Sequence, residues 1–130
     1  MPHIRGIAEI VLNVHDTGQA LVFYRDLLGL EVVSPPELPN VFLKAGPGQA
    51  GIPQMIVLVP LPVGADAFTQ PRTLHHLALE VTPEDFDALA EHLRANGHAP
   101  RNGRHPVVPS RTLYIDDPDG NEVEIICRVE

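Results

Sequence analysis

The chain has 130 residues, with 9 Lys and Arg, 17 Asp and Glu, and a formal net charge of −8 at pH 7. This acidic balance argues against nucleic acid or an anionic membrane surface as a partner, because both bind a basic footprint. No apolar run is long enough to cross a membrane, and the N-terminal residues show no signal-peptide core. The single cysteine, Cys127, cannot form a disulfide within the chain. These features favour a cytoplasmic protein of one domain or two small modules.

The first half of the chain predicts one helix among four strands. Residues 7–14 alternate between apolar and polar side chains in the manner of a half-buried strand. Asp16 is a suitable N-cap for an amphipathic helix that stops at Gly29. Three further strands are expected at residues 30–33, 41–45 and 54–59.

The second half predicts the same order of elements. A strand at residues 74–81 precedes a helix that starts at Thr82-Pro83 and stops at Gly97. Between the halves, the proline-rich residues 60–72 are interpreted as a linker. The later elements are a weak strand at 98–100, a basic loop at 101–105, a strand at 112–115, a tight turn at 116–121 and a strand at 123–129.

The two halves repeat at an offset of 67 positions, which is the separation of Glu9 and His76. Strand, helix and helix-ending glycine recur in the same order, and such recurrence is typical of internal duplication. We therefore predict an α+β fold of two tandem β-α-β-β-β modules. The modules span residues 1–60 and 73–130 and are joined by the linker, residues 60–72, within a single domain.

Three stretches carry a resemblance to a known family: residues 23–30 (FYRDLLGL), 76–79 (HLAL) and 114–124 (YIDDPDGNEVE). Together they resemble the vicinal oxygen chelate superfamily, which includes glyoxalase I, methylmalonyl-CoA epimerase, fosfomycin-resistance enzymes, extradiol dioxygenases and bleomycin-binding proteins. The resemblance covers nearly the whole chain and implies a single glyoxalase-like domain, in which a cupped mixed sheet holds a divalent metal. It is specific for the fold and weak for the reaction, because the fold hosts several chemistries.

The resemblance also implies which residues bind the metal. It places ligands on the first strand of each module and on the last strand, and these positions are Glu9, His76 and Glu124. Val57 stands at a fourth position that some members use and cannot bind a metal, so three protein ligands and open positions are expected. One imidazole and two carboxylates favour Mn²⁺, Fe²⁺ or Mg²⁺, and Ni²⁺ and Zn²⁺ are also compatible.

Strand parity agrees with this ligand set. Glu9 and Asn13 share a face of the first strand, and His76 and Glu124 take the matching parity of two later strands. The opposite parity is almost wholly apolar and should pack against the helices. A carboxylate in a partly closed cavity is costly unless a cation neutralises it, and a divalent ion does so.

Four further residues are candidates for the substrate site. Tyr114 lies where ring-cleaving dioxygenases carry an active-site tyrosine, so it is the candidate catalytic residue, with a plain pocket wall as the alternative. Arg111 and His105 are candidates for binding an anionic substrate. Asn13 stands where glutathione-dependent relatives place an arginine and is the third candidate for substrate binding.

Two simpler interpretations need no metal. Glu9 could form an ion pair with Arg111. His75 has the opposite parity from His76 and is expected in the core or facing a helix.

The first function hypothesis is a small metal-dependent enzyme, either a lyase or isomerase or a dioxygenase. Its metal acts as a Lewis acid on a small-molecule substrate with vicinal oxygens. The absence of histidine between His15 and His75 counts against ring cleavage. The alternatives are a bleomycin-resistance-like protein that binds a small molecule without turnover, and a structural dimer with a vestigial site. Because the family often dimerises, we expect a homodimer, with modules paired within one chain or exchanged between two.

Overall fold

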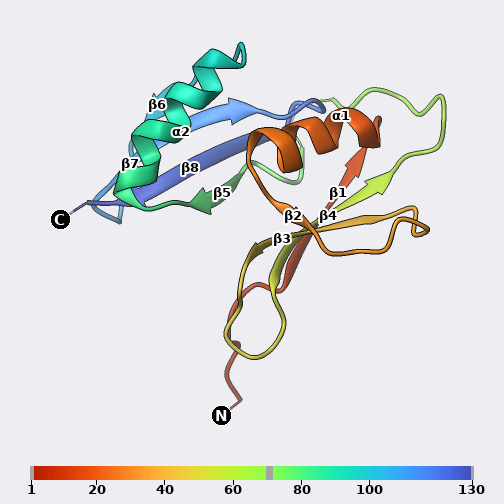
Figure 1. Cartoon of the computed structure of the whole chain (residues 1–130), viewed down its shortest axis with the longest axis horizontal. Helices are drawn as coiled ribbons and strands as arrows, with labels where there is room; N and C mark the ends of the chain where they lie inside the picture. Colours follow the sequence, from red (N-terminus) through yellow and green to blue (C-terminus); the bar gives the residue numbers. More distant parts are fainter. Residues whose placement is uncertain (1, 70–71, 130) are drawn as a thin grey trace. The chain divides into compact units, whose positions relative to one another are not determined.

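The computed structural model describes residues 2–69 and 72–129 (Figure 1). It divides the chain into two compact units, Met1–Ala67 and Phe68–Glu130. The boundary between the units falls inside the stretch interpreted as a linker. Gln70 and Pro71 of that stretch lie outside the described residues.

The first unit is a four-stranded mixed sheet with one helical segment. The strands follow the order β1-β4-β3-β2, in which β1 runs parallel to β4 and the other pairs are antiparallel. The elements are β1 (Glu9–Val14), α1 (Thr17–Leu21), the π-helix η1 (Val22–Leu27), β2 (Glu31–Val32), β3 (Val41–Gly46) and β4 (Gln54–Pro60).

The helical segment of the first unit starts as predicted and then widens. The Asp16 carboxylate accepts a hydrogen bond from the backbone N–H of Gln19 at 3.0 Å, which confirms the N-cap. After α1, the N–H of Leu28 donates to the carbonyl of Phe23, a five-residue step typical of a π-helix. The wider turn accompanies the burial of two adjacent aromatic residues, Phe23 and Tyr24. The single amphipathic helix predicted here is therefore a short α-helix continued by a π-helix.

The second unit repeats this design. Its sheet has the order β5-β8-β7-β6, again with one parallel pair, β5 with β8. Helix α2 packs against β8. The elements are β5 (Leu77–Glu80), α2 (Pro83–Ala95), β6 (Arg101–Gly103), β7 (Ser110–Asp116) and β8 (Glu122–Arg128).

Strand β6 is displaced from its predicted position at residues 98–100. The N–H of His98 donates to the carbonyl of Leu93 at 3.0 Å, and Gly97, with φ 85°, donates to Arg94 at 3.1 Å. These bonds form the C-terminal cap of α2, in which the glycine takes the left-handed conformation. The start of the predicted strand is thus part of the helix cap, and β6 forms at residues 101–103 instead.

Strand register confirms the predicted duplication. In the first unit Val11 pairs with Val57, and in the second Ala78 pairs with Glu124, which are the same two positions moved by the offset of 67 residues. The α+β fold of two β-α-β-β-β modules, each with its own mixed sheet, is therefore confirmed.

The predicted alternation between a core face and a polar face is also confirmed. On β1, Leu12 and Val14 are buried whereas Glu9, Val11 and Asn13 are exposed. On β8, the side chains of the core parity are almost completely buried; they are Val123, Ile125 and Cys127. Among the described residues, no helix combines the length and apolar character that crossing a bilayer requires.

Helix α2 offers a test of the capping argument. The Thr82 hydroxyl accepts a hydrogen bond from the N–H of Asp85 at 3.2 Å. We expect Thr82→Ala to lower the free energy of unfolding by about 1 kcal/mol, because one N–H of the first turn loses its partner. Thr82→Ser keeps the hydroxyl and should restore most of the loss in urea denaturation. Equal destabilisation by both substitutions would contradict a capping role.

Candidate functional site

The candidate site is built around Glu124, in the middle of β8. Strand β8 lies between β5 and β7, and register places Ala78 on one side of Glu124 and Tyr114 on the other. The side chain of Glu124 is only 3% exposed. A charged group thus sits on an inner strand, where its position is set by hydrogen-bonded neighbours on both sides.

His76 is the neighbouring side chain that contacts this carboxylate. It immediately precedes β5, and its Nε2 atom lies 3.1 Å from Oε1 of Glu124. Its side chain is 33% exposed, so the imidazole spans from the buried carboxylate toward solvent. The His76 ring also meets the Tyr114 ring edge to face, with centroids 5.8 Å apart. The structure therefore brings together three predicted site residues, His76, Glu124 and Tyr114.

The second oxygen of Glu124 is unsatisfied within the protein. Oε2 is buried and has no hydrogen-bond partner among the described residues. A buried polar atom without a partner is costly, and most so when it carries charge. A divalent cation next to Oε2 would remove this cost, and an imidazole nitrogen is already in place as a further ligand. His76 and Glu124 thus fit the metal that the sequence resemblance implies.

Tyr114 holds its proton strongly. Burial raises the pKa of Tyr114 above its ordinary value of 10.0, and the negative charge of Glu124 and hydrogen bonding to that carboxylate raise it further, whereas hydrogen bonding to Thr112 lowers it. Burial and the Glu124 carboxylate both disfavour the phenolate. At neutral pH the side chain is therefore a neutral phenol, which can donate a hydrogen bond to an oxygen atom in the site.

Gly103 on β6 provides the space that the Tyr114 ring occupies. A methyl group at Gly103 would overlap Cε2 of Tyr114 and approach the Thr112 hydroxyl to 2.8 Å. Gly103 is not among the glycines with positive φ, so its backbone conformation does not require glycine. Glycine is required at position 103 because a side chain there would fill the space of the Tyr114 ring. Gly103 thus positions the phenol by letting the ring lie across β6.

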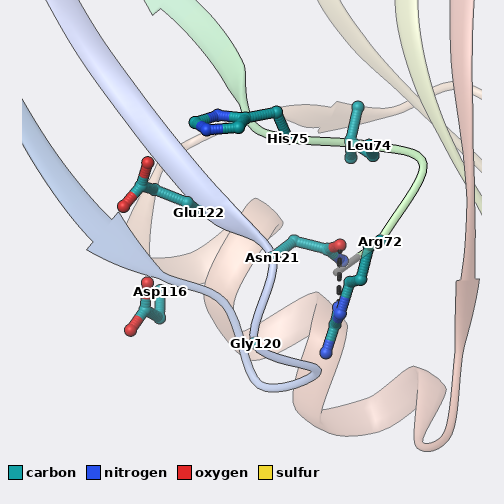
Figure 2. Close-up of a pocket in the computed structure, with 7 residues that line it drawn as sticks. All are labelled: Arg72, Leu74, His75, Asp116, Gly120, Asn121 and Glu122. Atoms are coloured by element: carbon teal, nitrogen blue, oxygen red, sulfur yellow. Dashed lines mark hydrogen bonds between the residues drawn. The ribbon is translucent and has the colours of Figure 1, made fainter. Parts of the chain in front are cut away.

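A pocket of about 380 Å³ opens beside the site, within the second unit. His75 and Glu122 lie at one side of it. Arg72 and Asn121 lie at the other side and are joined to each other by a 3.1 Å hydrogen bond (Figure 2). The other lining residues are Leu74, Asp116 and Gly120.

The pocket corrects the expectation for His75. His75 is exposed and lines the pocket, so its predicted place in the core or against a helix is wrong. The physical reason is that β5 starts at Leu77, and strand parity does not extend to residues before the ladder begins. The Nδ1 atoms of His75 and His76 are 2.7 Å apart.

The remaining predicted residues are described within their own units. Arg111 lies on the helix side of β7, where it binds Asp87 at 2.8 Å and stacks over Phe86. Hydrogen bonding by Arg111 lowers the pKa of Asp87. Nδ1 of His105 accepts hydrogen bonds from two N–H groups of its own loop. Glu9 and Asn13 are exposed on β1 of the first unit.

Three contributors to the site were missed in the sequence. Thr112 shares the strand parity of Tyr114, so the pattern that indicated Tyr114 also pointed to Thr112. Glu122 shares the parity of Glu124 in the same way. Gly103 had no signal, because its role depends on which strand pairs with β7.

Comparison with known proteins places these features in context. A family model described as the glyoxalase/bleomycin resistance protein/dioxygenase superfamily matches residues 6–125. A lactoylglutathione lyase of Haemophilus influenzae is 27% identical over 127 residues, covering 92% of this chain and 90% of that protein. Among solved structures, a glyoxalase/dioxygenase from Nostoc punctiforme is 26% identical with a TM-score of 0.73, covering 97% of this chain and 92% of the other. A lactoylglutathione lyase from Agrobacterium tumefaciens is 28% identical with a TM-score of 0.69, covering 96% and 95%.

The elevated pKa of Tyr114 can be measured directly. The chain has two tyrosines and no tryptophan, so in a Tyr24→Phe background the ultraviolet signal of ionisation belongs to Tyr114. In metal-free protein we expect a midpoint above 10.0, the ordinary value. Glu124→Gln should move the midpoint partway back, because burial remains after the charge is removed. Glu91→Gln, which removes an exposed acid on α2, should leave it unchanged. A wild-type midpoint at or below 10.0 would contradict the claim that burial and Glu124 raise the pKa of Tyr114.

Gly103→Ala tests the positioning of the phenol. The added methyl group should push the Tyr114 ring out of its place, destabilise the fold by roughly 1–3 kcal/mol through overpacking, and shift the tyrosine midpoint toward its ordinary value. Asn102→Ala changes the exposed neighbour on β6 and serves as the matched control. If the midpoint is the same in Gly103→Ala and wild type, Gly103 does not position Tyr114.

Proposed function

Because this chain belongs to the glyoxalase/bleomycin resistance protein/dioxygenase superfamily, we propose that it is a metal-dependent enzyme of the lyase or isomerase type. Its substrate would be a small molecule with two neighbouring oxygens. The observation that carries the proposal is the buried Oε2 atom of Glu124, which has no partner among the described residues and lies on a carboxylate held by His76. A site that needs a cation in order to be satisfied is a natural place for a catalytic metal.

The proposed ligands are His76, Glu124 and Glu9. The first two are supported by their 3.1 Å contact and by the unsatisfied oxygen. Glu9 is included because it occupies, in the first repeat, the position equivalent to His76, and because the family resemblance places a ligand there. Two carboxylates and one imidazole suit Mn²⁺, Fe²⁺, Ni²⁺ or Zn²⁺. When bound, such an ion polarises a substrate oxygen as a Lewis acid.

The named relatives favour the lyase or isomerase reaction over ring cleavage. Two of the similar proteins are lactoylglutathione lyases. Their shared chemistry suggests a thiol adduct of a 2-oxo aldehyde as the substrate class. The sequence departs from a glutathione-specific pattern at Asn13, where an arginine is expected, and at Val57, where a fourth ligand is expected. The proposal therefore extends to the substrate class and not to glutathione itself.

In this proposal Tyr114 is a hydrogen-bond donor. Its raised pKa means that the phenol is protonated at neutral pH, so it is not a ready base. The protonated oxygen can bind a substrate oxygen and stabilise negative charge that develops there. Loss of such a donor typically reduces kcat by roughly 10²–10³-fold. Glu124, which is buried and lies opposite Tyr114 in the strand register, orients the phenol from the neighbouring strand.

We also propose that the protein is a cytoplasmic homodimer. Strand β1 is at an edge of its sheet and carries exposed apolar residues, with Val11 52% exposed and Ile7, just before the strand, 65% exposed. An edge strand with exposed apolar side chains is suited to cover by a second chain. Light scattering of the purified protein measures the oligomeric state.

Metal content and turnover test the proposal together. Wild-type protein should contain about one equivalent of a divalent metal and should convert at least one of a panel of thiohemiacetals, epoxides and 2-oxo acids. Glu124→Ala should lose the metal of the buried centre and lower turnover by roughly 100-fold or more, because a Lewis acid contributes several kcal/mol to transition-state stabilisation. If the bound metal proves to be iron, catechols with oxygen join the panel.

A control variant and a check of folding accompany the measurements of metal content and turnover. Glu91→Gln removes an exposed acid from α2 and should keep both metal and turnover. Circular dichroism checks that Glu124→Ala is folded. Absence of metal after reconstitution with Mn²⁺, Fe²⁺, Ni²⁺ and Zn²⁺ would overturn the enzyme proposal. Stabilisation by a ligand without turnover would then identify a small-molecule-binding protein.

A further inference from the structure

The His76 imidazole has a polar partner at each of its two nitrogens. On the buried side, Nε2 lies 3.1 Å from Oε1 of Glu124. On the exposed side, Nδ1 lies 2.7 Å from Nδ1 of His75. One ring thus joins the buried carboxylate to the pocket that His75 and Glu122 line (Figure 2).

These contacts define two arrangements of protons. A neutral imidazole carries a proton on one nitrogen and a lone pair on the other. When Nε2 of His76 donates to Glu124, its Nδ1 accepts a hydrogen bond from His75. When Nε2 presents its lone pair to the buried side, Nδ1 carries the proton and donates to His75. The 2.7 Å distance between the nitrogens is compatible with either arrangement.

We propose that His75, His76 and Glu122 form a second, outward-facing site for a borderline divalent cation such as Zn²⁺. Each residue offers one ligand atom, and these atoms lie within 4.8 Å of one another. Two imidazoles and one carboxylate form a donor set that zinc prefers, and the adjoining pocket leaves room for water as a fourth ligand. This site is distinct from the proposed buried centre, which uses Nε2 of His76 with Glu124 and Glu9.

The surroundings supply the support that such a site requires. Metal-binding histidines usually donate their other N–H to a carboxylate, which fixes the ring and strengthens it as a ligand. Glu124 is placed to accept from Nε2 of His76 while Nδ1 binds the outer cation. The exposed His75 can move its proton to its other nitrogen at little cost, since that nitrogen can bond to water.

Glu122 can turn to the cation without leaving a charge unpaired. One of its oxygens lies 3.2 Å from Arg101, and the same guanidinium lies 3.0 Å from Asp116. If Glu122 moves toward His75, Arg101 keeps Asp116 as its partner. The exchange takes place at the protein surface, where the loss of one ion pair has a small effect.

Sharing His76 makes the two sites mutually exclusive. A neutral ring has one lone pair, so it binds a metal through Nε2 or through Nδ1 and not through both. Zinc in the outer site should therefore hold His76 in the arrangement that does not serve the buried centre. This step rests on the proposed function, whereas the outer site itself does not.

Zinc binding by metal-free variants tests the outer site. Glu124→Gln should weaken the buried centre, yet its amide oxygen still accepts from Nε2 of His76. We expect Glu124→Gln to retain about one equivalent of Zn²⁺ in equilibrium dialysis. Adding His75→Ala or Glu122→Gln to this background should weaken zinc binding by roughly tenfold or more, since even supporting residues of a metal site contribute that much. Adding His3→Ala, which removes an exposed histidine of the first unit, should change nothing.

A second background keeps the test decisive if Glu124→Gln does not fold. Glu9→Ala alters an exposed residue and weakens the buried centre in the same way. Zinc binding in this background should again depend on His75 and Glu122. Zinc affinity unchanged by both His75→Ala and Glu122→Gln would overturn the outer site. If Glu124→Gln loses turnover but keeps zinc binding that depends on His75, both proposals are supported. If zinc binding is retained but no metal-loaded wild-type preparation shows turnover, only the enzyme proposal is refuted.

Discussion

The second unit depends on one constraint, which is that a carboxylate is held on an inner strand with only one of its oxygens partnered. Glu124 is 3% exposed, and its position is set by hydrogen-bonded strands on both sides. The carboxylate therefore has to be partnered from the open side, by a hydrogen bond with His76 and by a cation. The charge of Glu124 acts on the Tyr114 phenol and helps to keep it protonated. The free-energy cost of burying this one carboxylate thus determines which partners it needs and keeps the neighbouring phenol protonated.

The two sheets repeat one design but differ in role: the first has an apolar, structural centre, and the second carries the polar groups of the candidate site. Strand register makes Phe42 and Val57 of the first sheet a neighbouring pair, as Tyr114 and Glu124 are in the second. Val57 is 2% exposed and apolar, so the centre of the first sheet is stabilised by apolar packing. The second sheet places polar groups at the matching positions and needs a partner for them. The fold tolerates both solutions because the backbone ladder is the same.

Much of this arrangement could be predicted from local patterns, and the failures have identifiable causes. Alternation along β8 placed Glu124 opposite the core parity, and Asp16 and Thr82 marked helix starts, because parity and caps are short-range properties. The place of β6 was mispredicted because the cap of α2 uses His98. The part of the predicted site formed by His76, Glu124 and Tyr114 comes together in the structure. The orientation of His75 could not be inferred, since it precedes the ladder that gives parity its meaning.

The difference in support between Glu124 and His76 has a kinetic consequence. Glu124 is fixed within three strands, whereas His76 lies just outside β5 with a side chain that is 33% exposed. Of the two proposed ligands in the second unit, His76 is the one with room to turn, so it would detach before Glu124. Rotation of the His76 ring would therefore break one ligand contact, and the rate at which a chelator strips the protein would depend on the rate of that rotation. Affinity and exchange rate would then be governed by different residues, the first by the buried carboxylate and the second by the histidine at the strand's entrance.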